Sequence, residues 1–141
     1  MKKIEDFRKH LVLILEAGFI AVNQQDEDSA LKLFKAAALL NPESTLPKVG
    51  IGYLHLHKLE LKQACKAFED VLEKEPYNDM AKAFLGLSMT MTTDKVAEGE
   101  KILTDTQLST SDEQVKTLAA SALDFVDRFV KKNTKQSRKP L

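Results

Sequence analysis

The sequence predicts an all-α protein built from three tandem helical hairpins and a closing helix. Ala, Leu, Lys, Glu and Gln dominate its 141 residues, and these are strong helix formers. Apolar side chains recur at three- and four-residue spacing, which is the period of an amphipathic helix. The third observation is an internal repeat, because a 34-residue shift of the sequence against itself brings matching residue types into register.

Small residues, large apolar residues and prolines carry this repeat. The residues in register are Gly18, Gly52 and Gly86; Ala30 and Ala64; Phe34, Phe68 and Ile102; and Pro42 and Pro76. Small residues let two antiparallel helices approach closely, and a large apolar residue one turn later fills the space beside them. Proline just past the second helix ends it. The third unit departs from the pattern, because Glu98 stands where a small residue is expected, Asp105 where an apolar one is, and Thr110 where proline is.

Helical periodicity divides the chain into seven helices. The expected ranges are about 3–23, a helix after the acidic turn at 26–28, and then about 45–58, 61–74, 78–92, 95–107 and 112–132. They form repeats at about 11–44, 45–78 and 79–110 and a capping helix at about 112–132, within a single domain over residues 1–132. Residues 133–141 are expected to form a flexible basic tail, since positions 131–141 hold five basic side chains and no acid.

Composition and charge narrow the function classes. The formal net charge is zero, so the chain as a whole has no bulk attraction to nucleic acid or to anionic lipid. The first residues carry charges where a signal peptide requires an apolar run, and no stretch reaches the roughly 18 apolar residues of a membrane span. A cytoplasmic protein is therefore expected. Cys65 is the single cysteine, which excludes an internal disulfide, and it is expected to pack as a small hydrophobic side chain.

Catalytic chemistry finds no support in the sequence. His55 and His57 are two residues apart on a helix, about 200° around its axis, so they cannot chelate one metal together. No cysteine–histidine spacing fits zinc, and there is no phosphate-binding glycine loop or Gly-x-Ser-x-Gly nucleophile turn. We therefore predict a binding protein with no catalytic residue, no metal site and no cofactor.

The repeat resembles the tetratricopeptide repeat (TPR) over about residues 11–110. The resemblance implies a right-handed superhelix of three TPR-like hairpins plus a C-terminal capping helix, with the first helix of each hairpin lining a concave face. The ligand-facing positions of such repeats correspond here to mostly apolar residues, which are predicted to bind a peptide: Val12, Leu15, Phe19, Val22, Leu46, Val49, Tyr53, Leu56, Met80, Ala83, Leu87 and Met91.

Two interpretations of these apolar positions stay open. They either line a partner groove or pack in the core, partly under the final helix or a dimer partner. The groove is favoured, because the other helix faces already supply a core and a large exposed apolar patch marks an interaction site. Binding an acidic C-terminal peptide would require Lys, Arg and Asn, whereas Leu15, Phe19, Gly50, Met80 and Phe84 stand on this face. An apolar trough with methionines and aromatic rings suits an amphipathic helix.

Three segments resemble the TPR chaperones of type III secretion systems, and most of all the small needle-subunit chaperones. They are Glu16-Ala17-Gly18-Phe19-Ile20, Leu39-Leu40-Asn41-Pro42 and Ala83-Phe84-Leu85-Gly86-Leu87. The resemblance implies a cytoplasmic chaperone that holds the amphipathic helix of a needle subunit in its groove, with a small helical co-chaperone as a further partner and a homodimer as a possible state. The alternatives are a chaperone of translocator proteins, a generic TPR scaffold in a larger assembly, and a basic-tailed protein that touches RNA or a membrane surface.

Overall fold

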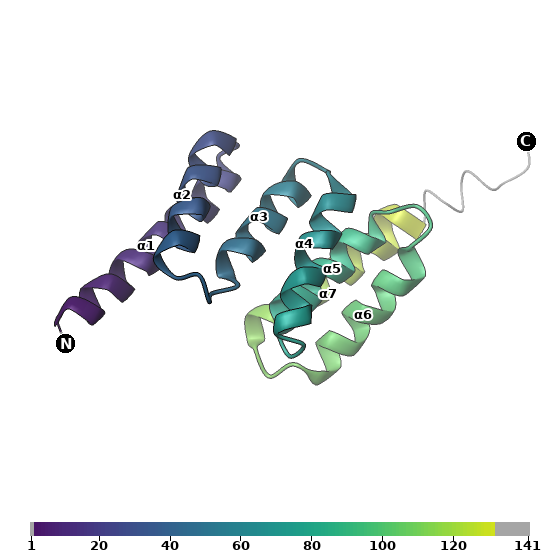
Figure 1. Ribbon diagram of the computed structural model, residues 1–141. Helices are drawn as coiled ribbons and strands as arrows, with labels where there is room; N and C mark the ends of the chain where they lie inside the picture. The colour runs from purple at the N-terminus through teal and green to yellow at the C-terminus, as the bar shows by residue number, and fades with distance from the viewer. Residues whose placement is uncertain (1, 132–141) are drawn as a thin grey trace, which may run out of the picture. The chain divides into compact units, whose positions relative to one another are not determined.

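The computed structural model describes residues 2–131, with side chains from residue 6 onward. Within that range the chain is 82% helical and contains no strand, which confirms the predicted all-α class. The helices in chain order are α1 (Lys2–Asn23), α2 (Glu27–Leu40), α3 (Leu46–His57), α4 (Leu61–Lys74), α5 (Asp79–Thr90), α6 (Val96–Ser109), α7 (Glu113–Phe125) and a π-helical turn, η1 (Val126–Val130) (Figure 1). They correspond one for one to the predicted ranges, with η1 continuing the last helix.

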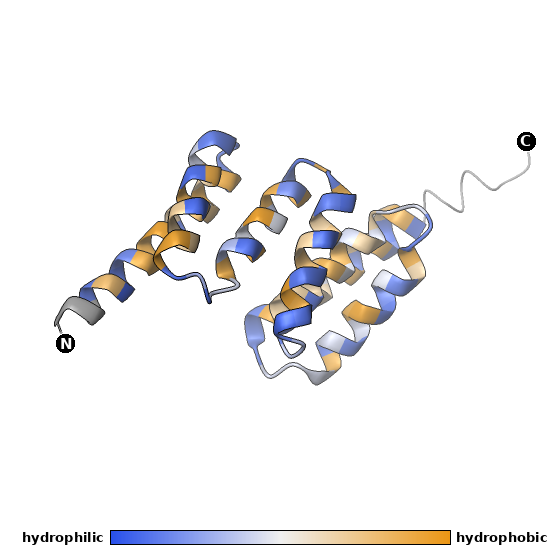
Figure 2. Ribbon diagram, in the orientation of Figure 1, coloured by the Kyte–Doolittle hydropathy of each residue, from blue (hydrophilic) through white to orange (hydrophobic). Residues whose placement is uncertain are grey.

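The helices are amphipathic, and hydrophobic residues alternate around them with hydrophilic ones (Figure 2). None of the helices between residues 2 and 131 is both long and apolar enough to cross a membrane. The sequence predicts a single domain, whereas the packing of the chain divides it into two compact units, Met1–Lys74 and Glu75–Leu141. The first holds α1 to α4 and the second holds α5 to η1, and each is described by itself below.

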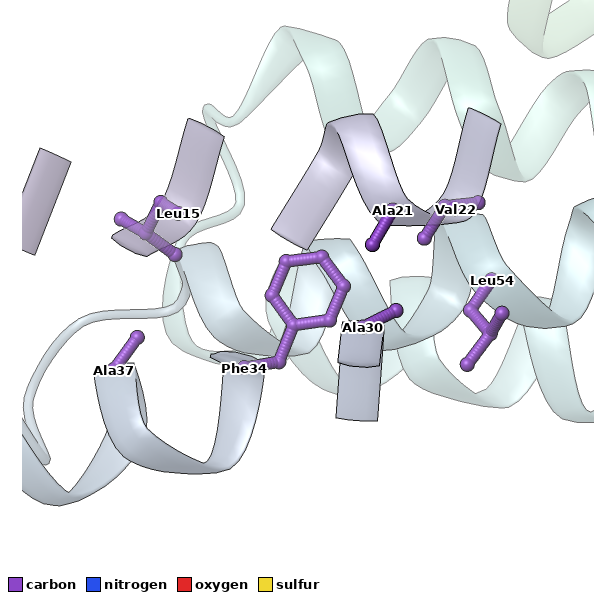
Figure 3. Close-up of a cluster of buried hydrophobic side chains, with 7 residues drawn as sticks. All are labelled: Leu15, Ala21, Val22, Ala30, Phe34, Ala37 and Leu54. Carbon is purple, nitrogen blue, oxygen red and sulfur yellow. The ribbon is translucent and has the colours of Figure 1, made fainter. Parts of the chain in front are cut away.

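The core of the first unit is built around the ring of Phe34 on α2. A Cβ atom added to Gly18 of α1 would lie 2.6 Å from Phe34 Cε1, and one added to Gly50 of α3 would lie even closer to the same atom. Phe34 therefore fills a space that exists only because both facing residues are glycine. Figure 3 shows this ring beneath α1, within a cluster of buried residues that also holds Leu15, Ala21, Val22, Ala30, Ala37 and Leu54.

The α3–α4 hairpin repeats this arrangement with Phe68 and Gly52. A Cβ atom on Gly52 would lie 2.7 Å from Phe68 Cε1, and Phe68 is fully buried. Cys65, three residues before Phe68, is also buried. The first two hairpins therefore close on a glycine–phenylalanine pair, and the two pairs stand one full period apart, as the repeat predicts.

The turns of these two hairpins are alike as well. Gln25 and Leu59, again one period apart, adopt the left-handed conformation with φ values of 62° and 59°. Residues 2–131 contain no other non-glycine residue with positive φ, so the turn between α5 and α6 is built differently. It is also longer. Helix α4 begins at Leu61, one period after the first residue of α2, whereas α6 begins at Val96, one residue later than the period requires.

The α5–α6 hairpin corrects the predicted register of the third repeat. Leu103, and not Ile102, packs against Gly86: a Cβ atom on that glycine would lie 2.8 Å from Leu103 Cγ, and Leu103 is fully buried. Gly99 takes the place of the expected small residue, while Glu98 is exposed. The same one-residue shift puts Thr106, which is buried, at the position where the repeat placed Asp105, which is exposed. Because α6 begins one residue later than the period requires, every position of α6 is shifted by one, which explains why the 34-residue alignment placed charged residues at core positions.

Helix α7 closes the second unit against α5 and α6. Its N-cap residue Asp112 accepts a hydrogen bond from the backbone N–H of Gln114 at 2.8 Å, which satisfies one of the free donors of the first turn. Ala119 and Ala122 of α7 pack with Leu103 in a buried cluster. The basic run noted in the sequence begins at Lys131, which forms ion pairs with Glu100 at 3.0 Å and Asp127 at 3.4 Å. The predicted flexible tail, residues 133–141, lies outside the described residues.

Candidate protein-binding surface

The first helices of the first two hairpins, α1 and α3, pack side by side and bring two predicted binding residues together. The ring centroids of Phe19 and Tyr53 lie 5.6 Å apart, and both side chains are partly exposed. Phe19 also meets the buried ring of Phe34 edge-on, at a centroid separation of 5.3 Å. Tyr53 in turn meets the ring of His57 at 4.5 Å. These contacts form a continuous aromatic row from the core to the surface of the unit.

The hydroxyl group of Tyr53 gives this row a polar tip. It donates a hydrogen bond to Oδ1 of Asn23 at 2.7 Å, which joins the last residue of α1 to α3. Partial burial raises the pKa of Tyr53 above its usual value, against the opposing effect of the hydrogen bond to Asn23. The phenol therefore stays protonated and remains a donor at neutral pH. A ring with an apolar body and a hydrogen-bonding tip is typical of protein interfaces.

Two further predicted residues, Val12 and Leu46, are accessible at equivalent positions of α1 and α3. Val12 is 52% exposed and Leu46 is 49% exposed. Together with Phe19 and Tyr53 they make up what we call the α1/α3 face, which consists of these four residues. Val12 and Leu46 stand one repeat period apart, and so do Phe19 and Tyr53. The repeat therefore places like side chains on neighbouring parallel helices.

Four other predicted binding residues of the first unit are buried, as in the second of the two interpretations, which placed such residues in the core: Leu15, Val22, Val49 and Leu56. Leu15 and Val22 point from α1 into the cluster around Phe34 (Figure 3). They lie on the flank of α1 that faces the core of the unit, so they contact their own chain. In the structure the accessible apolar surface of this unit is therefore narrower than the sequence predicts.

The four predicted residues of the second unit divide similarly. Ala83 is buried, and Met80, Leu87 and Met91 are partly buried. Leu87 packs against the cluster of Leu103 and the α7 alanines, so the closing helix covers part of it. Met80 and Met91 stand near opposite ends of α5, with Met91 directly after its last residue. Both methionine side chains are unbranched and adaptable, which suits an irregular apolar ligand.

A charged network borders the α3–α4 turn and was not foreseen from the sequence. Nδ1 of His55 lies 3.0 Å from Oε1 of Glu60, and Lys58 contacts Glu27 at 2.7 Å and Glu60 at 3.3 Å. The hydrogen bonds from His55 and Lys58 lower the pKa of Glu60, while those to Glu27 and Glu60 raise the pKa of Lys58. The network ties this turn to the first residue of α2. Glu27 comes from a different hairpin, so no local spacing in the sequence could reveal this contact.

The side chains described between residues 6 and 131 contain no group of three His, Cys, Asp or Glu residues placed to hold a metal ion. The predicted binding residues that stay accessible are apolar or aromatic, and among them Tyr53 carries a hydrogen-bonding hydroxyl group. Comparison with known proteins yields no match to a family model, to a curated protein or to a solved structure.

Proposed function

We propose that this chain is a TPR-type chaperone that binds an amphipathic helix of another protein through the first helices of its hairpins. One observation carries the proposal: Phe19 and Tyr53 contact each other and stay partly exposed, with exposed Val12 and Leu46 also paired by the repeat on the same two helices. Apolar side chains repeated on parallel neighbouring helices offer successive anchor sites. An amphipathic helix meets such a surface with side chains at positions i, i+3, i+4 and i+7.

The chemistry of the α1/α3 face favours an apolar ligand over a charged one. Its four residues include no lysine or arginine, which an acidic peptide carboxylate would require. The hydrogen-bonding group of this face is the hydroxyl of Tyr53, which is neutral and donates to Asn23. Burying four apolar side chains of the ligand helix at about 1.5–3 kcal/mol each leaves a useful affinity after the entropic cost of association. In the second unit, Met80 and Met91 offer the same apolar chemistry.

The ligand in this proposal is an export substrate of a type III secretion system, and specifically its needle subunit, held soluble and unpolymerised in the cytoplasm. The resemblance of the three segments that contain Gly18, Pro42 and Gly86 supports this choice. A small helical co-chaperone is the further expected partner. The alternatives are a chaperone of translocator proteins in the same system and a generic TPR scaffold, both of which use the same fold.

The test is co-expression of the full chain with a secretion-system needle subunit from the same organism, followed by size-exclusion chromatography. We expect the wild-type chain to retain the subunit, and the V12D/L46D double variant to lose at least about tenfold in retention, because two charges would be buried against an apolar helix. Leu39→Asp is the matched control, since Leu39 is exposed on α2 outside this face. Circular dichroism confirms that each variant is folded.

The outcomes separate the alternatives. If the wild-type chain retains translocator proteins but not the needle subunit, the translocator alternative replaces our assignment. If V12D/L46D retains its substrate as well as the wild-type chain does, the α1/α3 face is not the binding surface. If the chain retains neither class of substrate, the chaperone proposal is wrong and the scaffold alternative stands.

A further inference from the structure

The last helix exposes two phenylalanine rings that contact each other. Phe125, the final residue of α7, is 40% exposed, and Phe129 of η1 is 55% exposed. Their ring centroids lie 5.2 Å apart, so the two side chains form one apolar patch at the yellow end of the chain in Figure 1. We call it the Phe125/Phe129 patch, and it consists of these two residues. Single apolar side chains are ordinary on a protein surface, whereas exposed aromatic rings in contact indicate an interaction site.

Other side chains hold this helix to its unit. Ala122 and Val126 are buried, and Val126 has no accessible surface. Ala122 packs with Leu103 of α6 in a buried cluster. The helix therefore has core contacts that do not depend on the two rings, and shortening the rings should leave it folded.

The cations nearest to the rings in the sequence are paired with carboxylates. Nε of Arg128 lies 3.0 Å from Oδ1 of Asp124. Nζ of Lys131 lies 3.4 Å from Oδ1 of Asp127 and 3.0 Å from Oε2 of Glu100 on α6. Each cation beside the patch is thus balanced by a carboxylate, so the patch itself is apolar and its helix end carries no excess of positive charge.

Positive charge is concentrated directly after this helix. In the sequence, residues 132–141 hold four basic side chains and no acidic one: Lys132, Lys135, Arg138 and Lys139. The whole chain has 21 basic and 21 acidic residues, so the remainder has 17 basic against 21 acidic ones. The basic run begins three residues after Phe129, so apolar rings and cations are neighbours in the chain. Aromatic side chains beside a run of Lys and Arg are typical of segments that bind anionic lipid.

We propose that the Phe125/Phe129 patch and the basic run together bind the surface of an anionic phospholipid bilayer. The two rings enter the boundary between headgroups and acyl chains, and the four cations contact lipid phosphates. Each Lys or Arg near such a surface strengthens binding about fivefold. Binding of this kind is reversible, unlike the insertion of a membrane-spanning helix. The patch shares no residue with the α1/α3 face, so the proposal does not depend on the ligand of that face.

A single-stranded nucleic acid is the other polyanion that aromatic rings and cations bind. Such sites stack bases on ring faces and place cations along the backbone beside them. Here the two rings pack against each other with an angle of 35° between their planes, and the neighbouring Arg128 and Lys131 are already paired with carboxylates. A bilayer takes up apolar rings without needing a free ring face. The observations therefore favour lipid over nucleic acid.

Co-sedimentation of the full chain with lipid vesicles tests the proposal. One set of vesicles contains phosphatidylcholine alone, and the other contains phosphatidylcholine and phosphatidylglycerol in equal parts. We expect binding to the anionic vesicles to be at least about tenfold tighter, and to weaken about tenfold between about 0.1 and 0.5 M salt, because salt screens the cations. A chain that stays in solution with the anionic vesicles overturns the proposal, and so does equal binding to both sets.

Two double variants separate the apolar and the charged contribution. F125A/F129A should bind anionic vesicles about tenfold more weakly and keep its salt dependence, because it loses the rings and keeps the cations. K135E/K139E should bind at least about tenfold more weakly and lose most of its salt dependence. The matched controls are Leu39→Ala, an exposed leucine on α2, and K32E/K62E, two exposed lysines on α2 and α4. Both controls should bind to within about threefold of the wild-type chain, and circular dichroism confirms that each variant is folded.

A fluorescent reporter distinguishes insertion of the rings from attraction of the cations alone. The chain contains no tryptophan, so Phe129→Trp places a single reporter in the patch. We expect its emission to move to shorter wavelength when anionic vesicles are added, because the ring leaves water. Leu39→Trp is the control and should show no such shift. An unshifted emission from vesicle-bound Phe129→Trp overturns the proposal. Tighter binding to single-stranded RNA than to anionic vesicles would replace the bilayer with a nucleic acid as the ligand.

Discussion

The hairpins α1–α2 and α3–α4 close in one way, and the hairpin α5–α6 closes in another. In the first two, the ring of Phe34 or Phe68 fills the space over a glycine, and the turn contains one left-handed residue. In the third, Gly86 and Gly99 face each other, and a Cβ atom on Gly99 would lie 2.6 Å from the carbonyl oxygen of Gly86. A leucine completes the packing instead of an aromatic ring.

The difference shows that a close helix pair in a repeat can be reached with different residues. A ring over a glycine fills the space beside the helices with side-chain atoms, which have some freedom to move. Two facing glycines bring backbone against backbone, where neither side can give way without moving a whole helix. The longer turn before α6 moves Gly99 and Leu103 into these places, one residue beyond the repeat positions.

The substitution with the largest expected effect on stability tests the register of α6 directly. Leu103→Ala should lower the free energy of unfolding by about 2–5 kcal/mol, since Leu103 is fully buried against Gly86. Ile102→Ala should cost about 1 kcal/mol, because Ile102 is only partly buried. Urea unfolding followed by circular dichroism measures both. If Ile102→Ala costs as much as Leu103→Ala, the 34-residue alignment is correct and the shifted register is wrong.

Two substitutions with smaller expected effects on stability compare a glycine that faces backbone with a glycine that faces a ring. Gly99→Ala and Gly52→Ala should each destabilise by about 1–3 kcal/mol, despite the higher helix propensity of alanine. The Cβ atom on residue 99 meets the backbone of Gly86 and Thr90, whereas the nearest atoms to the one on residue 52 all belong to the ring of Phe68. Shortening that side chain with Phe68→Leu should therefore rescue Gly52→Ala in part, as a double-mutant cycle measures.

The matching cycle in the third hairpin provides the contrast. Thr90→Ser removes the methyl group that lies 2.7 Å from the position of a Cβ atom on Gly99, but it leaves the backbone contacts in place. We expect Thr90→Ser to give Gly99→Ala no rescue beyond about 0.5 kcal/mol. Equal rescue in the two hairpins would show that both close on deformable side chains.

The smallest expected effect is acid sensitivity in the first two hairpins. Hydrogen bonds from His55 and Lys58 lower the pKa of Glu60 below its ordinary 4.5, and those from Lys66 and Lys48 lower the pKa of Asp70 below 3.8. A lowered folded-state pKa means that the unfolded chain binds protons first, so this stability is present above the ordinary values and is lost as the pH falls through the lowered ones. These side chains are near the surface, so the loss should be small.

Urea unfolding between about pH 7 and pH 2.5 measures this loss. Glu60→Gln should unfold with a smaller loss on acidification than the wild-type chain, because its side chain no longer titrates. Glu43→Gln, which replaces an exposed carboxylate before α3, is the control. An identical pH profile for Glu60→Gln and the wild-type chain would show that the network at the α3–α4 turn contributes nothing to stability.

Much of the fold was predictable because helices are local. Apolar spacing and the 34-residue period were enough to place all seven helices and to align the glycine and phenylalanine positions of the first two hairpins. The pattern failed at Ile102, since a helix that begins one residue late keeps its apolar spacing intact, but a different residue then meets the partner helix. Gly99, one position after the expected small residue, was the available signal.

The candidate binding surface was predictable only in part. Hydropathy marks Leu15 and Val12 as similarly apolar, because a core position and a partner-binding position select the same kind of side chain. Leu15 is buried and Val12 is exposed because only one flank of α1 meets Phe34, and residues distant in the chain decide which flank that is. Helix type, hairpin order and the first two glycine–phenylalanine pairs thus follow from spacing along the sequence. The division of apolar residues between core and surface, and the register of α6, follow from contacts between helices, which no local spacing encodes.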